Sequence, residues 1–196
     1  MKLFKVAVAS LILGVGFASQ ATDFTVKAKE NSVSGGTGLN TGLVYNMGDL
    51  ITGSVSVDDL WNSGALPRWS NANGQIGDLF YNGIDSQVTD WNASIDVGDK
   101  IGKNWNGSYS KSGFTFAYGT FVGQIGSTYF ELGTDFSVAA PEAGTLNLFY
   151  WDSNKNDNSG SIVASITPVP EASTYALMLS GLGIVGLMVR RRKLKQ

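Results

Sequence analysis

Hydrophobic and polar residues alternate in short runs through the middle of the chain. Between Leu50 and Val57, the apolar residues Ile51 and Val55 fall on one side of an extended chain, and hydroxyl side chains fall on the other. This period of two is typical of a strand with one buried and one solvated face. Comparable runs predict strands at Phe24–Lys29, Thr41–Asn46, Asp49–Val57, Asp78–Tyr81, Phe114–Ile125, Thr128–Gly133, Leu146–Trp151 and Ser161–Ile166.

Glycine, asparagine, aspartate and serine separate these runs, and helical periodicity is scarce between residues 22 and 167. Many short strands with such turns predict an all-β domain at residues 22–167, an antiparallel β-sandwich of the jelly-roll kind. Residues 58–112 are the least regular part and are rich in Asn, Gly, Ser and Trp. We expect long surface loops there.

The first 21 residues have the layout of a secretory signal peptide. Lys2 and Lys5 precede the apolar run Val6–Phe17, and Ser19 and Ala21 are small residues at the expected cleavage site. The alternative is a buried first helix, but the order of charged, apolar and small residues favours export through the Sec machinery.

The C-terminal segment, residues 168–196, predicts a membrane-associated sorting signal. Residues 172–189 form an uncharged stretch of 18 residues, which reaches the lower limit for crossing a bilayer. A basic tail at residues 190–196 follows, and the positive-inside rule would keep it in the cytoplasm. We expect a motif at 169–173 and a transmembrane helix at 174–189.

The order of VPEAS (Val169–Ser173), a short apolar helix and a basic cluster resembles the PEP-CTERM sorting signal. The resemblance implies that an exosortase in the inner membrane processes the protein and passes it to the cell surface or extracellular matrix. Ala172 replaces the second proline of the motif. A plain C-terminal membrane anchor is the alternative. The residues expected to carry the signal are Pro170, Glu171, Arg190, Arg191 and Arg192.

Charge and composition narrow the possible functions of the exported part. Residues 22–170 hold seven basic and fifteen acidic residues, a formal charge of −8, which argues against a nucleic-acid partner. Neither cysteine nor histidine occurs, which excludes disulfides, thiolate sites and Ser-His-Asp triads. Glycosidase chemistry needs two carboxylates, and Asp58, Asp59 and Glu131 are candidates without a signature spacing. We therefore expect no enzymatic activity.

The loop DSNKNDNSG (Asp152–Gly160) is longer than a hairpin turn requires and is dense in oxygen donors. Carboxylate, amide and backbone oxygens are the ligands that calcium prefers. The loop begins like an EF-hand, but Asp157 stands in place of the required glycine and Val163 in place of the glutamate. Composition alone leaves a calcium loop and a polar turn equally open.

Three segments occur in the order TGLVYNMGDLITGSVSV (Thr41–Val57), GTFVGQIG (Gly119–Gly126) and LNLFYWDSNKNDNSGSIVASI (Leu146–Ile166). Together they resemble the PA-IL family of galactophilic, calcium-dependent bacterial lectins. The resemblance implies a small galactose-binding-like β-sandwich. It also implies that a loop near the C-terminus holds Ca²⁺, which in turn holds two sugar hydroxyls.

The resemblance also implies individual roles. Asp152, Asp157 and Asn158 would bind the metal, together with the backbone carbonyl of Trp61 and one from Asn154 or Lys155. The residues expected to contact the ligand are Asp152, Ser153, Asp157 and Gln75. The family also uses a histidine here, which this chain lacks.

The leading hypothesis is an exported, calcium-dependent carbohydrate-binding protein whose partner is a carbohydrate or exopolysaccharide. Among the five tryptophans, Trp69 and Trp105 have polar neighbours and are the better candidates for stacking on a sugar. The alternative is a structural envelope or matrix protein that keeps the sandwich without a functional sugar site.

Overall fold

The computed structural model describes residues 20–89, 94–168, 179–186 and 190. Residues 179–186 are helical. Within the described ranges, no helix is both long enough and apolar enough to cross a membrane. The expected signal peptide up to residue 19, the motif at 169–173 and the expected helix at 174–178 and 187–189 lie outside the described residues.

All strands of the described domain pair in antiparallel fashion, apart from one isolated parallel bridge between Ser32 and Tyr150. The larger sheet has the order β12-β3-β14-β4-β5, and β1 also pairs with β14. The second sheet has the order β11-β10-β13-β2. The strands are β1 (Thr22–Lys27), β2 (Leu39–Tyr45), β3 (Leu50–Val55), β4 (Trp61–Asn62), β5 (Trp69–Ser70), β6 (Leu79–Phe80), β7 (Lys100–Gly102), β8 (Ser108–Lys111), β9 (Phe114–Ala117), β10 (Thr120–Ile125), β11 (Thr128–Glu131), β12 (Asp135–Ala139), β13 (Gly144–Trp151) and β14 (Ser159–Thr167).

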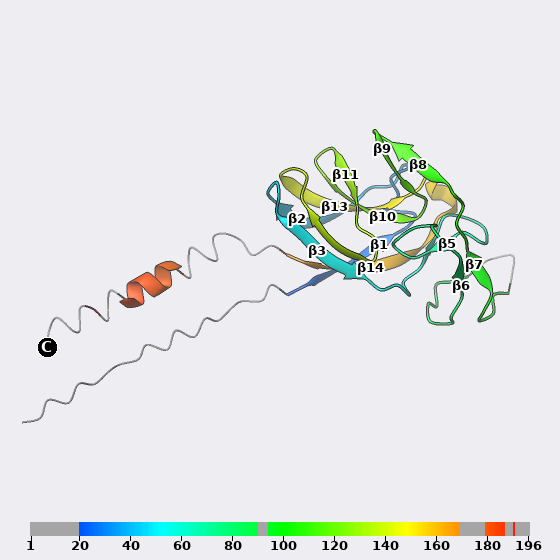
Figure 1. Ribbon diagram of the computed structural model, residues 1–196, viewed down its shortest axis with the longest axis horizontal. Helices are drawn as coiled ribbons and strands as arrows, with labels where there is room; N and C mark the ends of the chain where they lie inside the picture. The colour runs from blue at the N-terminus through cyan, green and yellow to red at the C-terminus, as the bar shows by residue number, and fades with distance from the viewer. Residues whose placement is uncertain (1–19, 90–93, 169–178, 187–189, 191–196) are drawn as a thin grey trace, which may run out of the picture.

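The two sheets pack face to face, and the prediction of an all-β antiparallel sandwich is confirmed (Figure 1). Val26 and Ile51 of the larger sheet and Leu148 of the second sheet belong to one buried cluster. Phe121 and Phe136 meet across the interface edge to face, with ring centroids 6.1 Å apart. These side chains come from the alternating positions of the strands, so the period of two in the sequence places them inside.

The turn Asn46–Asp49 connects β2 of one sheet to β3 of the other. The Asp49 side chain accepts a hydrogen bond from the Asn46 amide (2.7 Å), and the Asp49 amide donates back to the Asn46 carbonyl (3.0 Å). Gly48 has a φ of +88°, a conformation that a residue without a Cβ adopts at little cost. The YNMGD segment is therefore a corner between the sheets.

The outer face of the second sheet is covered by the β8–β9 hairpin. Phe116 packs edge to face on Trp151, with ring centroids 4.9 Å apart. The Trp151 indole N–H donates to the Tyr109 carbonyl over 2.7 Å. This packing fixes the hairpin beside the end of β13.

Two parts of the chain differ from the sequence-based expectation. The single strand predicted over Phe114–Ile125 is interrupted at Gly119, whose φ is +78° and whose Cβ would lie 2.4 Å from the Ser70 hydroxyl. Residues 58–112 are not only surface loops. They contain the five short strands β4 to β8, and Leu60, Trp69 and Ile101 form a small core of their own.

The chain enters and leaves the domain at the same end of the sandwich. Thr22 pairs with Ile166, so β1 begins where β14 ends. The loop at residues 152–158 precedes β14 and therefore lies at the opposite end of that strand. In Figure 1 the start of β1 and the end of β14 lie at the left of the domain, whereas β6 and β7 lie at the right.

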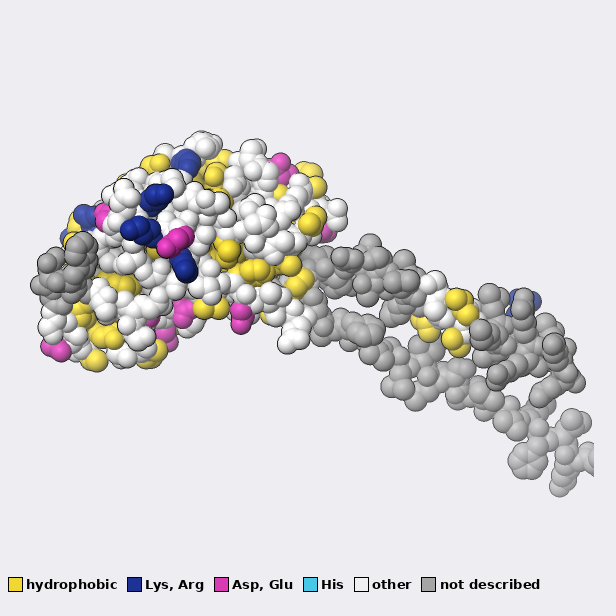
Figure 2. Space-filling view, turned by 180° about the vertical axis from the view of Figure 1, so that it is seen from behind, with side chains coloured by type: hydrophobic (Ala, Val, Ile, Leu, Met, Phe, Trp, Pro, Cys, Tyr) yellow, Lys and Arg dark blue, Asp and Glu magenta, His cyan; other side chains and the backbone are white. Residues whose placement is uncertain are grey.

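Basic side chains are few, and some of them gather on one face of the domain (Figure 2). Lys27, Lys29 and Glu30 line a shallow groove beside Ser159 and Gly160. The acidic net charge of the domain is therefore unevenly distributed.

Candidate functional site

Connections from both sheets meet at the end of the sandwich away from the termini. Thr120 of β10 pairs with Trp151 of β13, so residues before Thr120 and after Trp151 leave the second sheet at the same end. Ser159 of β14 pairs with Asn62 of β4, which pairs in turn with Trp69 of β5. The β4–β5 connection therefore approaches the loop at residues 152–158 from the larger sheet.

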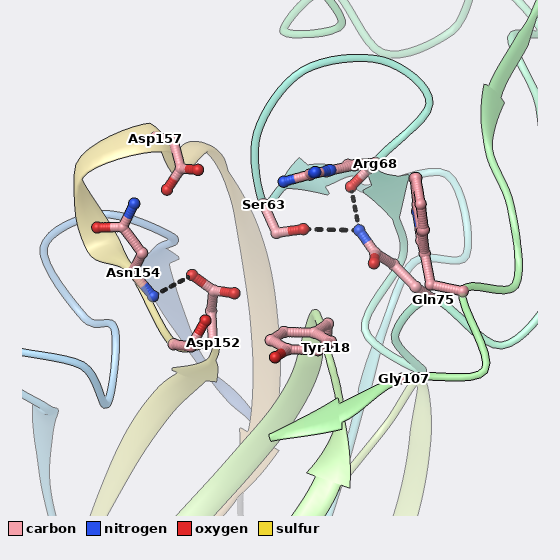
Figure 3. A pocket seen from close by; sticks show the side chains of 10 residues that line it. Ser63, Arg68, Gln75, Gly107, Tyr118, Asp152, Asn154 and Asp157 are labelled. Atoms are coloured by element: carbon pink, nitrogen blue, oxygen red, sulfur yellow. Dashed lines mark hydrogen bonds between the residues drawn. The ribbon is translucent and has the colours of Figure 1, made fainter. Parts of the chain in front are cut away.

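These connections enclose a cavity of about 300 Å³ (Figure 3). Four predicted ligand-contacting residues, Asp152, Ser153, Asp157 and Gln75, line this cavity together with Asn154. Asp152, Asn154 and Asp157 form one wall, and Arg68, Ser63 and Gln75 form the wall facing it. Gln75 follows β5, and its backbone amide donates to the Tyr118 carbonyl over 2.8 Å, which holds it beside the other lining residues despite its distance in sequence from the loop.

The loop at residues 152–158 is compact because asparagine and aspartate side chains cap its backbone. The Asp152 carboxylate accepts a hydrogen bond from the Asn154 amide over 2.9 Å, and the Asn154 side chain accepts one from the Asn156 amide over 3.2 Å. A single 3₁₀ turn, Lys155–Asp157, follows. The Asn158 side-chain amide then donates to the Ala28 carbonyl at the end of β1 (3.2 Å). These bonds fix the loop against the larger sheet.

The Asp152 carboxylate is buried beside a second carboxylate. Its residue is 4% exposed, whereas Asp157 is exposed. Burial raises the pKa of Asp152 above its ordinary value, and the charge of Asp157 raises it further. Hydrogen bonds from the Asn154 and Ser153 amides and from Asn158 act in the opposite direction. Within the described part of the chain, the one ion pair is Lys100–Asp78, so no described lysine or arginine pairs with Asp152.

Two buried oxygens next to Asp152 have no hydrogen-bond partner in the described structure. They are Oδ1 of Asn158 and the hydroxyl of Tyr150. Burial raises the pKa of Tyr150 well above its ordinary value, and Asp152 and Asp157 raise it too. A buried polar atom without a partner is costly, so a cation or water near either oxygen would be stabilising. Neither residue lines the cavity, and Asn158 lines the groove at Lys27 and Lys29.

The facing wall is held by a network around Gln75. Its side-chain amide donates to the Ser63 hydroxyl (2.7 Å) and to the Arg68 carbonyl (2.5 Å). The Arg68 guanidinium lies over the Trp105 ring, 5.3 Å from its centroid, and Lys103 Nζ lies 3.9 Å from the same centroid. The amide protons of Gln75 are therefore used within the protein, and its carbonyl oxygen is the group left to accept from a ligand.

Trp61 is not among the residues that line the cavity, and the role expected for its backbone carbonyl stays a prediction. Its side chain is fully buried and packs on Tyr150 (ring centroids 4.5 Å apart), and its indole N–H donates to the Gly119 carbonyl over 2.9 Å. Ser63, two residues later, lines the cavity instead. Trp69, one of the two tryptophans expected to stack on a sugar, is also buried, whereas Trp105 lines the cavity.

The carboxylates considered for glycosidase chemistry do not line the cavity either. The Asp58 side chain accepts from the Asn82 amide (2.9 Å), and the Asp59 side chain accepts from the Val163 backbone amide (2.9 Å). Glu131 lies in β11 of the other sheet and is exposed. These residues do not form a facing pair of carboxylates in the cavity.

Sequence reasoning missed Ser63, Arg68 and Tyr118 as lining residues. Arg68 could have been singled out from the sequence, because it is the sole arginine between residues 22 and 189. Tyr118 directly precedes the break at Gly119 and lines the cavity. No spacing in the sequence links these residues to the loop at 152–158.

Residues 168–193 match the model of the PEP-CTERM protein-sorting motif. This match supports an exported, exosortase-sorted chain. No curated protein matches the chain. Among solved structures, the chain is similar to one described as "EclA N-terminal domain; PllA-like lectin", with 17% sequence identity and a TM-score of 0.47, covering 76% of this chain and 98% of that chain. This likeness is too weak to carry a statement about function.

Proposed function

We propose that this protein is a non-enzymatic, calcium-dependent carbohydrate-binding protein that is sorted to the cell surface or extracellular matrix. The proposal rests on the buried Asp152 carboxylate, which faces a cavity of monosaccharide size beside a second carboxylate and without a cationic partner among the described residues. The sequence resemblance to the PA-IL family points in the same direction. A buried carboxylate beside a second carboxylate, with no ion-pair partner among the described residues, favours a site built for a cation.

The donors around Asp152 fit the chemistry of calcium. Asp152 and Asp157 supply carboxylate oxygens, and Asn158 supplies an amide oxygen that has no other described partner. Calcium takes six to eight oxygen ligands, and flexible loops with backbone carbonyls supply the remainder. The described residues contain no cluster of three or more acidic, histidine or cysteine side chains, so sugar hydroxyls or water would complete the shell. When bound, calcium would hold adjacent hydroxyls of the sugar.

The remaining lining residues suit the rest of a sugar ring. The Gln75 carbonyl oxygen would accept a hydrogen bond from a hydroxyl. Tyr118 and Trp105 add aromatic surface, on which the apolar face of a sugar can pack. Trp105 is 38% exposed, so part of its surface is accessible.

The position of the cavity agrees with delivery by a C-terminal signal. The chain enters β1 and leaves β14 at one end of the sandwich, and the loop at residues 152–158 lies at the other end of β14. A chain held at its C-terminus would therefore present the cavity away from the point of attachment.

Glycan binding with and without EDTA tests the proposal. The exported chain should bind at least one polysaccharide or glycan in calcium and lose binding in EDTA or in Asp152→Ala. Asp135→Ala, which removes an exposed aspartate at the far edge of the larger sheet, is the matched control and should bind normally. Calcium-dependent melting without any glycan signal would favour the structural alternative, and turnover of a polysaccharide would favour a glycosidase.

A further inference from the structure

The cavity carries opposite charges on its two walls. Asp152 and Asp157 stand on one wall, and Arg68 stands on the other (Figure 3). A Cβ built on Gly64 would lie 3.0 Å from Arg68 Nη1 and 3.2 Å from Asp157 Oδ2, so both charged groups border the same small space. They do not pair with each other, because the one ion pair in the described ranges lies elsewhere, between Lys100 and Asp78.

Arg68 is held in place without an ion pair among the described residues. Its carbonyl accepts hydrogen bonds from the Ser63 amide (3.3 Å) and from the Gln75 side chain (2.5 Å). Its guanidinium lies over Trp105, whose indole N–H donates to the carbonyl of the preceding residue, Pro67, over 3.3 Å. An arginine fixed by its backbone and by an aromatic ring retains its planar donors for an external acceptor.

The net charge that the cavity would have with calcium bound points to an anionic ligand. A calcium ion neutralises the two carboxylates of the opposite wall, and Arg68 then leaves one positive charge facing the cavity. Lys103, whose Nζ lies 3.9 Å from the centre of the Trp105 ring, adds to this positive side. A guanidinium matches a carboxylate by two parallel hydrogen bonds, which a neutral hydroxymethyl group cannot form.

We propose that the cavity selects an acidic saccharide, a uronate whose carboxylate pairs with Arg68 while its ring hydroxyls face the Asp152 wall. This inference rests on the proposed function, because the hydroxyls are assigned to the calcium side of the cavity. The basic side chains at Lys27 and Lys29 lie on a separate groove and supply a control for non-specific attraction of anions.

The inference is tested by comparing how tightly the exported chain, purified in detergent, binds sugars that differ at one carbon. Glucuronate is compared with glucose, and galacturonate with galactose, by calorimetry in calcium. If the uronate carboxylate pairs with Arg68, at least one of the two uronates should bind at least about tenfold more tightly than its neutral counterpart. Arg68→Gln should remove this preference, Arg68→Lys should retain part of it, and Lys29→Gln should leave it unchanged.

Stability measurements keep the result interpretable. Arg68→Gln should retain the calcium-induced rise in melting temperature, which shows that its fold and metal site are intact. Equal binding of acidic and neutral sugars by the unmodified protein would overturn the uronate proposal and leave the proposed function standing. If no sugar of either pair or of a wider glycan panel binds, both proposals fail. A preference that persists in Arg68→Gln but disappears in Lys29→Gln would place the anion in the other groove and overturn the assignment.

Discussion

Replacing Asp152 by asparagine separates the cost of burying a charge from the benefit of binding calcium. The new side chain has the same shape, and a carbonyl oxygen remains to accept the 2.9 Å hydrogen bond from the Asn154 amide. Burial raises the pKa of Asp152, so its ionised form destabilises the metal-free fold at pH values above that raised pKa. At neutral pH, Asp152→Asn should therefore melt at a higher temperature than the unmodified protein in EDTA.

Calcium should reverse this order. Extracellular calcium sites commonly have Kd values of about 10⁻⁴ M or weaker. At about 10 mM calcium, a hundredfold excess over such a Kd stabilises the folded state by about 2.7 kcal/mol. For a chain of this size, 1 kcal/mol corresponds to about 2–4 °C, so the unmodified protein should gain about 5–11 °C. Asp152→Asn loses a charged oxygen ligand and should gain little.

Thermal melting followed by circular dichroism, in EDTA and in calcium, measures both effects on the same samples. Asp135→Asn is the control, because Asp135 is exposed and lies on β12, away from the cavity. It should behave like the unmodified protein under both conditions. A full calcium-induced rise in Asp152→Asn would refute the role of Asp152 as a ligand. A lower melting temperature of this variant in EDTA would refute the proposed cost of burial.

Three further predictions concern pH, the core and the tail. As the pH falls through the raised pKa of Asp152, the metal-free fold should gain stability and the calcium-induced rise in melting temperature should shrink, because protonation removes both the buried charge and the ligand. Trp61→Phe should lower the free energy of unfolding in urea by about 1–3 kcal/mol, because the buried Gly119 carbonyl loses its indole donor, while calorimetry should find the same calcium affinity. Replacing residues 190–193 by neutral residues should impair delivery of the chain to the surface in a fractionation assay, and unaltered delivery would contradict the assignment of the sorting signal.

Much of the sandwich is predictable because alternation is a local property. The runs that became β1, β2, β3 and β14 place their more buried residues at alternate positions, such as Ile162, Ala164 and Ile166 in β14, whereas the end of β13 is buried on both faces. Strands β4 and β5 have two residues each, which is too short for a period to be visible. The break at Gly119 was also hidden, because it depends on how closely Ser70 approaches that backbone.

Sequence pattern predicts only the wall formed by residues 152–158, whereas Gln75 on the facing wall came from the family resemblance. The loop at residues 152–158 has a dense run of oxygen-bearing side chains, and its composition together with the preceding strand marks it as a possible cation loop. The other lining residues come from several connections: Ser63 and Arg68 lie between β4 and β5, Gln75 follows β5, and Tyr118 lies between β9 and β10. Their approach depends on the pairing of β4 with β14 and on the packing of the β8–β9 hairpin against Trp151. Such long-range packing leaves no periodic signal in the sequence.

Titration of calcium into the exported chain by calorimetry tests the central claim most directly. The account predicts saturable binding at one site per chain in the range up to millimolar calcium, with binding lost in Asp152→Asn and retained in Asp135→Asn. Absence of binding heat at millimolar calcium, or equal affinity in Asp152→Asn, would contradict the assignment of the cavity as a calcium-dependent sugar site.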